Sequence, residues 1–167
     1  MVKIVKKNTK TSDDKILSII LGILKDTTLA SMSTVDDMQQ PWINTFFFNF
    51  DDDLNFYLLT SPQTRHGENI KKNNRVAINI FDSHQKPSDK KKGVFVQGTC
   101  EQVVNPIDLV KGLVIYGERF GKIEGIKDVK DFAKLGWESR LYKVVPNYIK
   151  LFTEETGEEK YIDIFLK

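Results

Sequence analysis

A short polar segment of the sequence contains the side chains best suited to bind an anion. They are Thr60, Ser61, Thr64, Arg65 and His66. They precede a helix-like stretch, 67–72, whose first turn would carry a partial positive charge, so a cation such as Arg65 is unfavourable there unless a negative charge answers it. Hydroxyl groups and a guanidinium fork are good donors to phosphate oxygens, and Gly67 would let a ligand or a backbone segment approach closely. The segment is therefore either a phosphate anchor or a polar turn with an exposed arginine, and these residues alone favour neither.

Other kinds of site find little support in the sequence. The two histidines, His66 and His84, lie in different segments, and the chain has a single cysteine, so no metal-binding motif is present. The segment 51–53, three aspartates, lacks the spacing and the glycine of a calcium loop and is typical of a solvated turn. Cys100 lies among valines in a β-like run, where a buried structural thiol is far more common than a nucleophile. The sequence thus indicates no metal site and leaves any catalytic residue unknown.

The elements that must position these side chains can be predicted from periodicity. Ser12 and the two aspartates after it are typical of a helix start, and apolar residues then recur at helical spacing, which predicts a helix over 13–25. Pro106 and the spacing after it predict a helix over 106–120, and a third, short helix is expected at 127–134. Short β-like runs occupy 28–35, 42–50, 54–60, 75–81, 93–104, 137–145, 147–153 and 160–166.

Six or more strands in short hairpin steps, with a few helices between them, predict a mostly β (α+β) fold, an antiparallel barrel with peripheral helices. In the run 45–50, Phe46, Phe48 and Phe50 point to one face of the strand, and Phe47 points to the other. A strand that is apolar on both faces is covered on both faces. The barrel interior covers one face, so a helix, a ligand or a partner subunit must cover the other.

Composition limits the classes of function. We expect one domain, 1–167, because no shift in composition marks a second. The net charge of +2 and the scattered lysines and arginines give no argument for nucleic acid or for a membrane surface. With one cysteine and no apolar run near the roughly 20 residues of a membrane span, the sequence predicts a cytoplasmic protein.

Taken in order, these segments resemble the pyridoxamine 5'-phosphate oxidase-like superfamily of FMN-binding split barrels. The resemblance covers residues 27–104 and is carried mainly by TSPQTRHGENIKKNNRVAI at 60–78. The segment VFVQGTCEQV at 94–103 is similar to the next strand of that family, with its central glycine. The ending GWESRLYKVVPNYIKLF at 136–152 resembles the C-terminal strand pair of an uncharacterised bacterial branch.

The resemblance implies a split β-barrel that forms a homodimer, with FMN in a groove between the subunits. The family's Ser/Thr-Arg-Lys segment, which holds the FMN phosphate, falls on Thr64, Arg65 and His66. The strand end that also reaches the flavin falls on Thr60 and Ser61. The strand along the isoalloxazine ring falls on Asn44, Thr45, Phe46 and Phe47.

The chain departs from the oxidase itself at several positions. His66 replaces the family's lysine, so a positive charge there depends on pH. Asn44 and Asn49 stand where the oxidase has cationic residues beside the ring strand, and Gly93 replaces a glutamine. The oxidase's C-terminal Arg-x-His pair has no counterpart. These differences argue against oxidation of pyridoxamine 5'-phosphate more strongly than against FMN binding.

The resemblance predicts an FMN-binding protein and leaves two functions open. The first is a flavin-dependent oxidoreductase, in which FMN carries hydride or electrons between an unknown small-molecule substrate and an electron donor. The second is a carrier or sensor that binds a flavin, or another planar cofactor such as deazaflavin or haem, without turnover. Trp137 and Tyr116 could line the substrate side, but packing would explain both.

Overall fold

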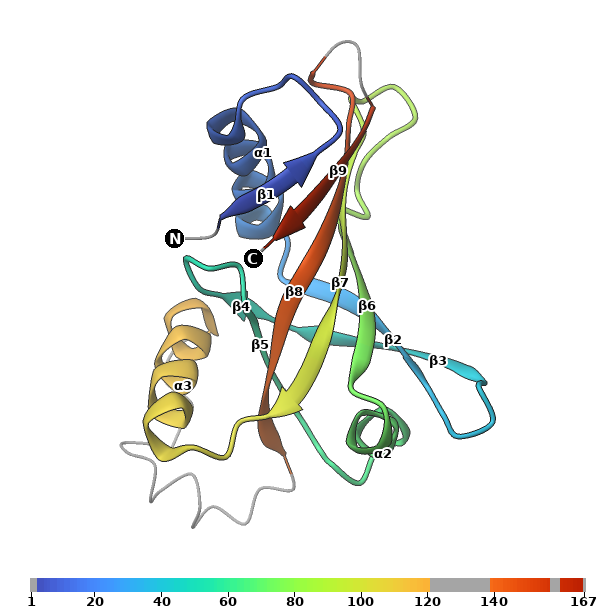
Figure 1. Ribbon diagram of the computed structural model, residues 1–167, viewed down its shortest axis with the longest axis vertical. Coiled ribbons are helices and arrows are strands. Elements are labelled where there is room, and N and C mark those ends of the chain that lie inside the picture. The colour runs from blue at the N-terminus through green and yellow to red at the C-terminus, as the bar shows by residue number, and fades with distance from the viewer. Residues whose placement is uncertain (1–2, 121–138, 157–159, 167) are drawn as a thin grey trace.

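Among the residues that the computed structural model describes, 3–120, 139–156 and 160–166, a nine-stranded antiparallel sheet organises the chain (Figure 1). In spatial order its main path is β1 (Ile4–Lys7), β9 (Tyr161–Leu166), β8 (Arg140–Thr153), β7 (Lys92–Gln102), β6 (Arg75–Phe81), β2 (Leu29–Val35) and β3 (Pro41–Phe47). The other two strands, β4 (Asn49–Phe50) and β5 (Phe56–Thr60), pair with each other, and β5 also pairs with β8.

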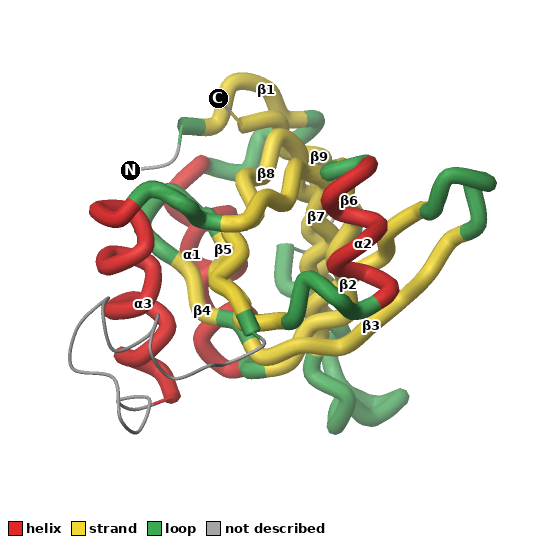
Figure 2. Tube along the Cα trace, turned by 90° about the horizontal axis from the view of Figure 1, so that it is seen from below, coloured by secondary structure: helices red, strands yellow, loops and turns green. Residues whose placement is uncertain are grey.

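Strand β8 is where the sheet divides into a split barrel. The first part of β8 pairs with β5 and the last part with β9, while β7 runs along the whole of its other edge. Because β3 continues through Phe48 into β4, and β4 pairs with β5, the strands close into a ring (Figure 2). The fold is therefore mostly β and antiparallel, as predicted.

Two of the three described helices begin where caps and apolar spacing predict. Helix α1 (Asp13–Asp26) follows Ser12, whose hydroxyl accepts a hydrogen bond from Lys15 N at 3.4 Å. Helix α3 (Pro106–Phe120) has the predicted bounds, and α2 (Arg65–Lys72) begins two residues before the expected stretch. The helix predicted at 127–134 lies outside the described residues. Helix α1 buries the side chains Ile16, Ile20, Ile23 and Leu24.

The apolar core lies inside the ring of strands and confirms the predicted alternation along 45–50. Phe46 and Phe48 are 7% and 0% exposed, and Phe50 packs at the margin of the core. Phe47 points outward and is 52% exposed. Its ring centroid lies 5.6 Å from that of Phe120, at the end of α3, so α3 covers part of this outer surface.

Arg119 contacts the backbone at the point where one predicted strand is divided in two. The run 42–50 is interrupted at Phe48, whose carbonyl accepts a hydrogen bond from Arg119 Nη1 at 3.2 Å. Arg119 Nη2 also donates to the carbonyls of Leu24 at 2.8 Å and Lys25 at 2.7 Å, where α1 ends. One guanidinium thus joins α3, the end of α1 and the break between β3 and β4.

Two other features of the sheet differ from the prediction. The described part of the run 137–145 and the run 147–153 form a single strand, β8, which passes Pro146 by a bulge: Pro146 lies opposite Gly98 of β7, and Tyr148 lies opposite Gln97. A Cβ atom on Gly98 would lie 2.3 Å from Val145 O, so this close approach requires glycine. Strand β1 was not expected from the sequence, because it is short and polar and pairs at the sheet edge with β9 alone.

The turn between β4 and β5 fixes the strand that leads to the candidate site. Asp51 Oδ1 accepts hydrogen bonds from the backbone N–H groups of Asp53 at 3.0 Å and Asn55 at 2.8 Å. Its Oδ2 accepts one from the Tyr57 hydroxyl at 3.0 Å. The aspartate segment 51–53 is thus a turn, as predicted, and β5 runs from it to Thr60.

Candidate functional site

Three of the predicted site residues form a hydroxyl–imidazole cluster where β5 gives way to α2. His66 Nε2 lies 2.5 Å from Thr60 Oγ1 and 3.0 Å from Thr64 Oγ1. Thr64 is the N-cap of α2, and its Oγ1 accepts a hydrogen bond from Gly67 N at 3.2 Å. The same hydroxyl donates to Ser61 O at 2.7 Å. The local sequence therefore brings these three side chains together.

The cluster limits what each hydroxyl can offer to a ligand. Thr64 has one hydroxyl proton, which it donates to Ser61 O, so Thr64 acts as a helix cap and not as a free donor. Ser61 Oγ accepts a hydrogen bond from Gln63 N at 3.2 Å and keeps its own proton to donate. Ser61 is therefore better placed than Thr64 to donate to an anion.

His66 is held as a neutral side chain. Burial lowers the pKa of its imidazole below the ordinary value, so the ring is uncharged at neutral pH. Its Nε2 faces Thr60 and Thr64. The pH-dependent positive charge expected at this position is thus disfavoured in the isolated subunit.

Arg65, the cation at the start of α2, already has partners in the chain. Its Nη2 lies 3.3 Å from Asp36 Oδ2, and its Cζ lies 4.6 Å from the centroid of the Trp42 ring. Hydrogen bonds from the backbone of Gln40 and Met38 hold the pKa of the Asp36 carboxyl below its ordinary value, so a negative charge faces the guanidinium. The Arg65 side chain remains 49% exposed and open to an incoming anion.

Close packing fixes α2 on its neighbours. A Cβ atom on Gly67 would lie 2.5 Å from Ser61 O, so this glycine serves the approach of a backbone segment. Asn69 Nδ2 donates to Thr34 Oγ1 at 3.0 Å in a buried contact, and Lys72 pairs with Asp37 at 2.5 Å. Helix α2 therefore lies against β2 and the turn that follows it.

The strand predicted to lie along the flavin ring is next to this helix. Asn44, Thr45, Phe46 and Phe47 belong to β3, which ends the main path of the sheet. Its outer edge has no strand partner among the described residues, so N–H and C=O groups there can bind a ligand. Asn44 Oδ1 is buried and has no hydrogen-bond partner within the described ranges. Arg65, at the start of α2, contacts Trp42, which lies two positions before Asn44 in the same strand.

Other predicted positions are not part of this arrangement. Asn49 Nδ2 donates to Ile115 O, so Asn49 ties β4 to α3. Tyr116 packs against Phe120 with ring centroids 4.9 Å apart, and burial raises the pKa of its hydroxyl. Packing therefore accounts for Tyr116, while Trp137 lies outside the described residues.

Asp36 and Trp42 are residues of the site that the sequence analysis misses. Both belong to the hairpin in which β2 pairs with β3, and Val35 lies opposite Pro41 in its register. Pairing the predicted runs 28–35 and 42–50 as a hairpin would have located the turn between them. No feature of the sequence near that turn indicates that it packs against α2.

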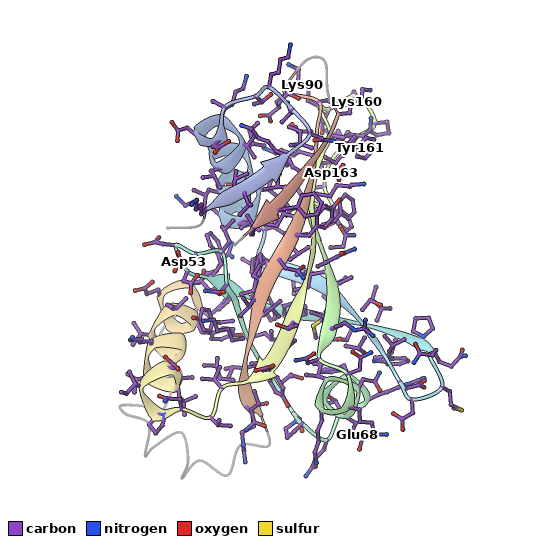
Figure 3. All side chains as sticks on the ribbon, viewed as in Figure 1. Asp53, Glu68, Lys90, Lys160, Tyr161 and Asp163 are labelled. Carbon is purple, nitrogen blue, oxygen red and sulfur yellow. The ribbon has the colours of Figure 1, made fainter. Side chains whose placement is uncertain are left out.

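The outer face of the sheet carries several exposed apolar side chains. Alternate outward positions of its strands carry the exposed side chains Leu29, Ile43, Phe47, Phe81, Phe95, Tyr161 and Phe165. A cavity of about 310 Å³ on this face is lined by Ser31, Ile43, Asn79, Phe95 and Tyr148, among others. Tyr161 and Asp163 project from β9 at one end of the sheet (Figure 3).

The part of the chain that the structure describes offers neither a metal cluster nor a membrane-spanning helix. It contains no group of three or more His, Cys, Asp or Glu side chains that could hold a metal ion. It also contains no helix long and apolar enough to cross a membrane.

The fold is similar to that of several solved structures. A putative 5-nitroimidazole antibiotic resistance protein from Bacteroides thetaiotaomicron has a TM-score of 0.67 at 16% identity, with 100% of this chain and 94% of that chain covered. HutZ, the haem storage protein of Vibrio cholerae, has a TM-score of 0.62 at 20% identity, with 76% and 87% covered. A Clostridium acetobutylicum protein of the pyridoxinephosphate oxidase family, related to general stress protein 26 of B. subtilis, has a TM-score of 0.61 at 19% identity, with 92% and 96% covered. At these identities the likeness shows the fold alone.

The sequence itself supplies the assignment to a family. A search of the curated proteins finds no match. Residues 20–144, well over half of the chain, match the family model described as pyridoxamine 5'-phosphate oxidase. The split barrel and the order of strands around α2 agree with that match, and the chain therefore belongs to the pyridoxamine 5'-phosphate oxidase family.

Proposed function

We propose that this protein is an FMN-binding homodimer in which Arg65 anchors the flavin phosphate beside the free edge of β3. The observation that carries the proposal is the position of the Arg65 guanidinium at the start of α2, 4.6 Å over the ring of Trp42 in β3. The family resemblance implies a cationic side chain on the FMN phosphate and a strand along the ring, and here such a side chain and such a strand are adjacent.

The donors around Arg65 suit a phosphate group. A guanidinium offers several N–H donors in a plane, and one contact to Asp36 leaves others for phosphate oxygens. The Ser61 hydroxyl and the first backbone N–H groups of α2 supply further donors. His66 contributes through position, because it holds Thr60 and the capping Thr64 together.

The free edge of β3 suits the polar edge of an isoalloxazine ring. Backbone N–H and C=O groups along Asn44–Phe47 can pair with the ring's carbonyl and imide groups. The Asn44 Oδ1 atom is buried by the chain itself, so the backbone of this strand, and not that side chain, is what the ring would contact. The residues present therefore fit FMN.

Bound FMN supplies hydride and electron transfer, and the chain supplies position and exclusion of water. We infer an FMN-dependent oxidoreductase that acts on a small-molecule substrate or electron donor. His66 Nε2 faces two threonine hydroxyls, and burial lowers the pKa of the ring, so we assign His66 a positioning role. Reduction of the FMN-loaded protein by NADH or NADPH, followed by reoxidation in air, tests turnover, and inertness toward common reductants would favour a carrier or sensor.

The homodimer is proposed because the apolar outer face of the sheet needs a cover. Phe47, Phe81 and Phe95 are 41–52% exposed on this face, and a second copy of the same surface would bury them. An obligate interface of this kind exceeds about 2,000 Å². Light scattering at micromolar concentration should give twice the 19.2 kDa of one chain, and a monomer mass would contradict the proposal.

Haem is the second candidate ligand, because the structural neighbours include a haem storage protein and a haem-binding protein. The histidines and the cysteine of the described residues are poor axial ligands. His66 Nε2 faces two hydroxyl groups, the His84 side chain is 93% exposed, and burial raises the pKa of the Cys100 thiol to about 12. Titration of the apoprotein with FMN and with haem, followed by absorbance, decides between them, and tight haem binding without FMN binding would overturn the flavin proposal.

A further inference from the structure

A carboxylate of the β2–β3 turn already faces the Arg65 guanidinium. Asp36 Oδ2 lies 3.3 Å from Arg65 Nη2, and only 19% of the Asp36 side chain is exposed. Its other oxygen, Oδ1, accepts hydrogen bonds from Met38 N and Gln40 N, each at 2.9 Å. These two backbone bonds hold the carboxylate in place whether or not Arg65 binds it.

An incoming anion can replace this carboxylate. The two side chains share a single N···O contact at a half-exposed arginine and not the bidentate fork of a strong pair. Exposed ion pairs of this kind contribute little to stability. The guanidinium also stacks over Trp42, so it stays in position when the carboxylate no longer binds it.

We propose that Asp36 is a resident counter-ion of Arg65 that competes with the anionic group of the ligand, and so sets how strongly the site prefers a phosphorylated flavin. This inference rests on the proposed FMN site. A phosphate that binds Arg65 must displace or share the Asp36 contact and then lies near a fixed negative charge, so it binds less tightly than it would to an unpaired arginine. A ligand without an anionic group at this place is unaffected.

Asp37 provides a matched control. It is the next residue of the same turn and pairs with Lys72, at the other end of the same helix. Asp37→Asn removes the same charge from the same turn and leaves the contact between Asp36 and Arg65 intact. Asp36→Asn keeps a side-chain oxygen for the two backbone hydrogen bonds, so the turn keeps its shape.

The experiment titrates FMN and riboflavin into wild type, Asp36→Asn and Asp37→Asn, followed by flavin fluorescence at low and high salt. We expect Asp36→Asn to tighten FMN about two- to fivefold, the value of an exposed pair, and to leave riboflavin unchanged. The gain should shrink at high salt, and Asp37→Asn should leave the ratio of FMN to riboflavin affinity unchanged. Inorganic phosphate, titrated while the Arg65 Nε–H signal is followed by NMR, should also bind Asp36→Asn more tightly.

The other outcomes either overturn the proposal or show whether the Asp36 competition or the FMN site itself has failed. A selective loss of FMN affinity in Asp36→Asn would show that Asp36 positions Arg65 and does not compete. An unchanged affinity ratio, or an equal change in Asp37→Asn, would show that Asp36 has no specific role. If wild type binds neither flavin, the FMN site fails, but tighter binding of inorganic phosphate to Asp36→Asn would still uphold the competition. If phosphate is not tightened either, the competition fails as well.

Discussion

Replacing Arg65 by alanine should weaken FMN and leave riboflavin nearly unchanged, because the two ligands differ only in the phosphate group. A charge-assisted hydrogen bond contributes about 1.5–3 kcal/mol. The Arg65 side chain is 49% exposed and shares its charge with Asp36, which argues for the lower end of that range. We therefore expect a loss of about 1.5 kcal/mol, roughly tenfold in Kd.

The assay is equilibrium titration of both flavins against wild type, Arg65→Ala and Arg65→Lys. The lysine variant keeps the charge but lacks the planar fork and the stacking over Trp42, so its loss of FMN affinity should be intermediate. Equal losses for FMN and riboflavin in Arg65→Ala would refute the reasoning, because they would mean that Arg65 supports the fold. Unchanged affinity for both would mean that the phosphate binds elsewhere.

Three further predictions concern chemistry and stability. Because asparagines replace the oxidase's cations at 44 and 49, the FMN-loaded protein should oxidise pyridoxamine 5'-phosphate negligibly, and robust formation of pyridoxal 5'-phosphate would contradict this. Arg119→Ala should lower the free energy of unfolding in urea by about 2 kcal/mol, because three backbone carbonyls lose a charged donor; a change as small as that of a neutral surface variant would contradict it. Burial lowers the pKa of His66, so the imidazole binds a proton more readily in the unfolded chain than in the folded one. The free energy of unfolding should therefore fall as pH falls below about 6.5. Urea unfolding at pH 7 and pH 5 measures this dependence, and His66→Gln should flatten it.

Much of the fold could be predicted because its signals are local. Ser12 and the acidic first turn mark the start of α1, Pro106 marks the start of α3, and β6 has the predicted bounds. The continuous course of β8 could not be predicted, because a proline in a strand normally ends it. It depends on the bulge after Pro146 in β8, opposite Gly98 of β7, and so on a pairing between segments far apart in the sequence.

The site, too, has a part set by neighbouring residues and a part set by contacts between distant segments. Thr60, Thr64 and His66 lie within seven consecutive residues, so a strand that turns into a helix brings them together. Asp36 is 29 residues from Arg65, and their contact depends on the docking of the hairpin against α2. An aspartate in a turn can pair with any cation that the fold brings near it, and the sequence does not indicate which cation that is.

Thr64 shows why a motif does not by itself identify a ligand contact. A hydroxyl at this position suits a phosphate donor and a helix N-cap equally well, because both use the space before the first turn. In this chain the cap accepts from Gly67 N and donates to Ser61 O, so both hydrogen-bonding functions of the hydroxyl are used within the backbone. The contribution of Thr64 to a phosphate site is then to shape the turn that presents Arg65.

The positive charge at the start of α2 is consequently balanced within the chain before any ligand binds. Asp36, in the β2–β3 turn, forms an ion pair with Arg65, and Glu68 lies in the first turn of the helix itself. The free energy that a phosphate gains at this site is therefore the difference between two counter-ions and not the full value of an arginine–phosphate contact. Because Asp36 is held by backbone hydrogen bonds of its own turn, that difference depends on the β2–β3 hairpin as much as on the motif residues of α2.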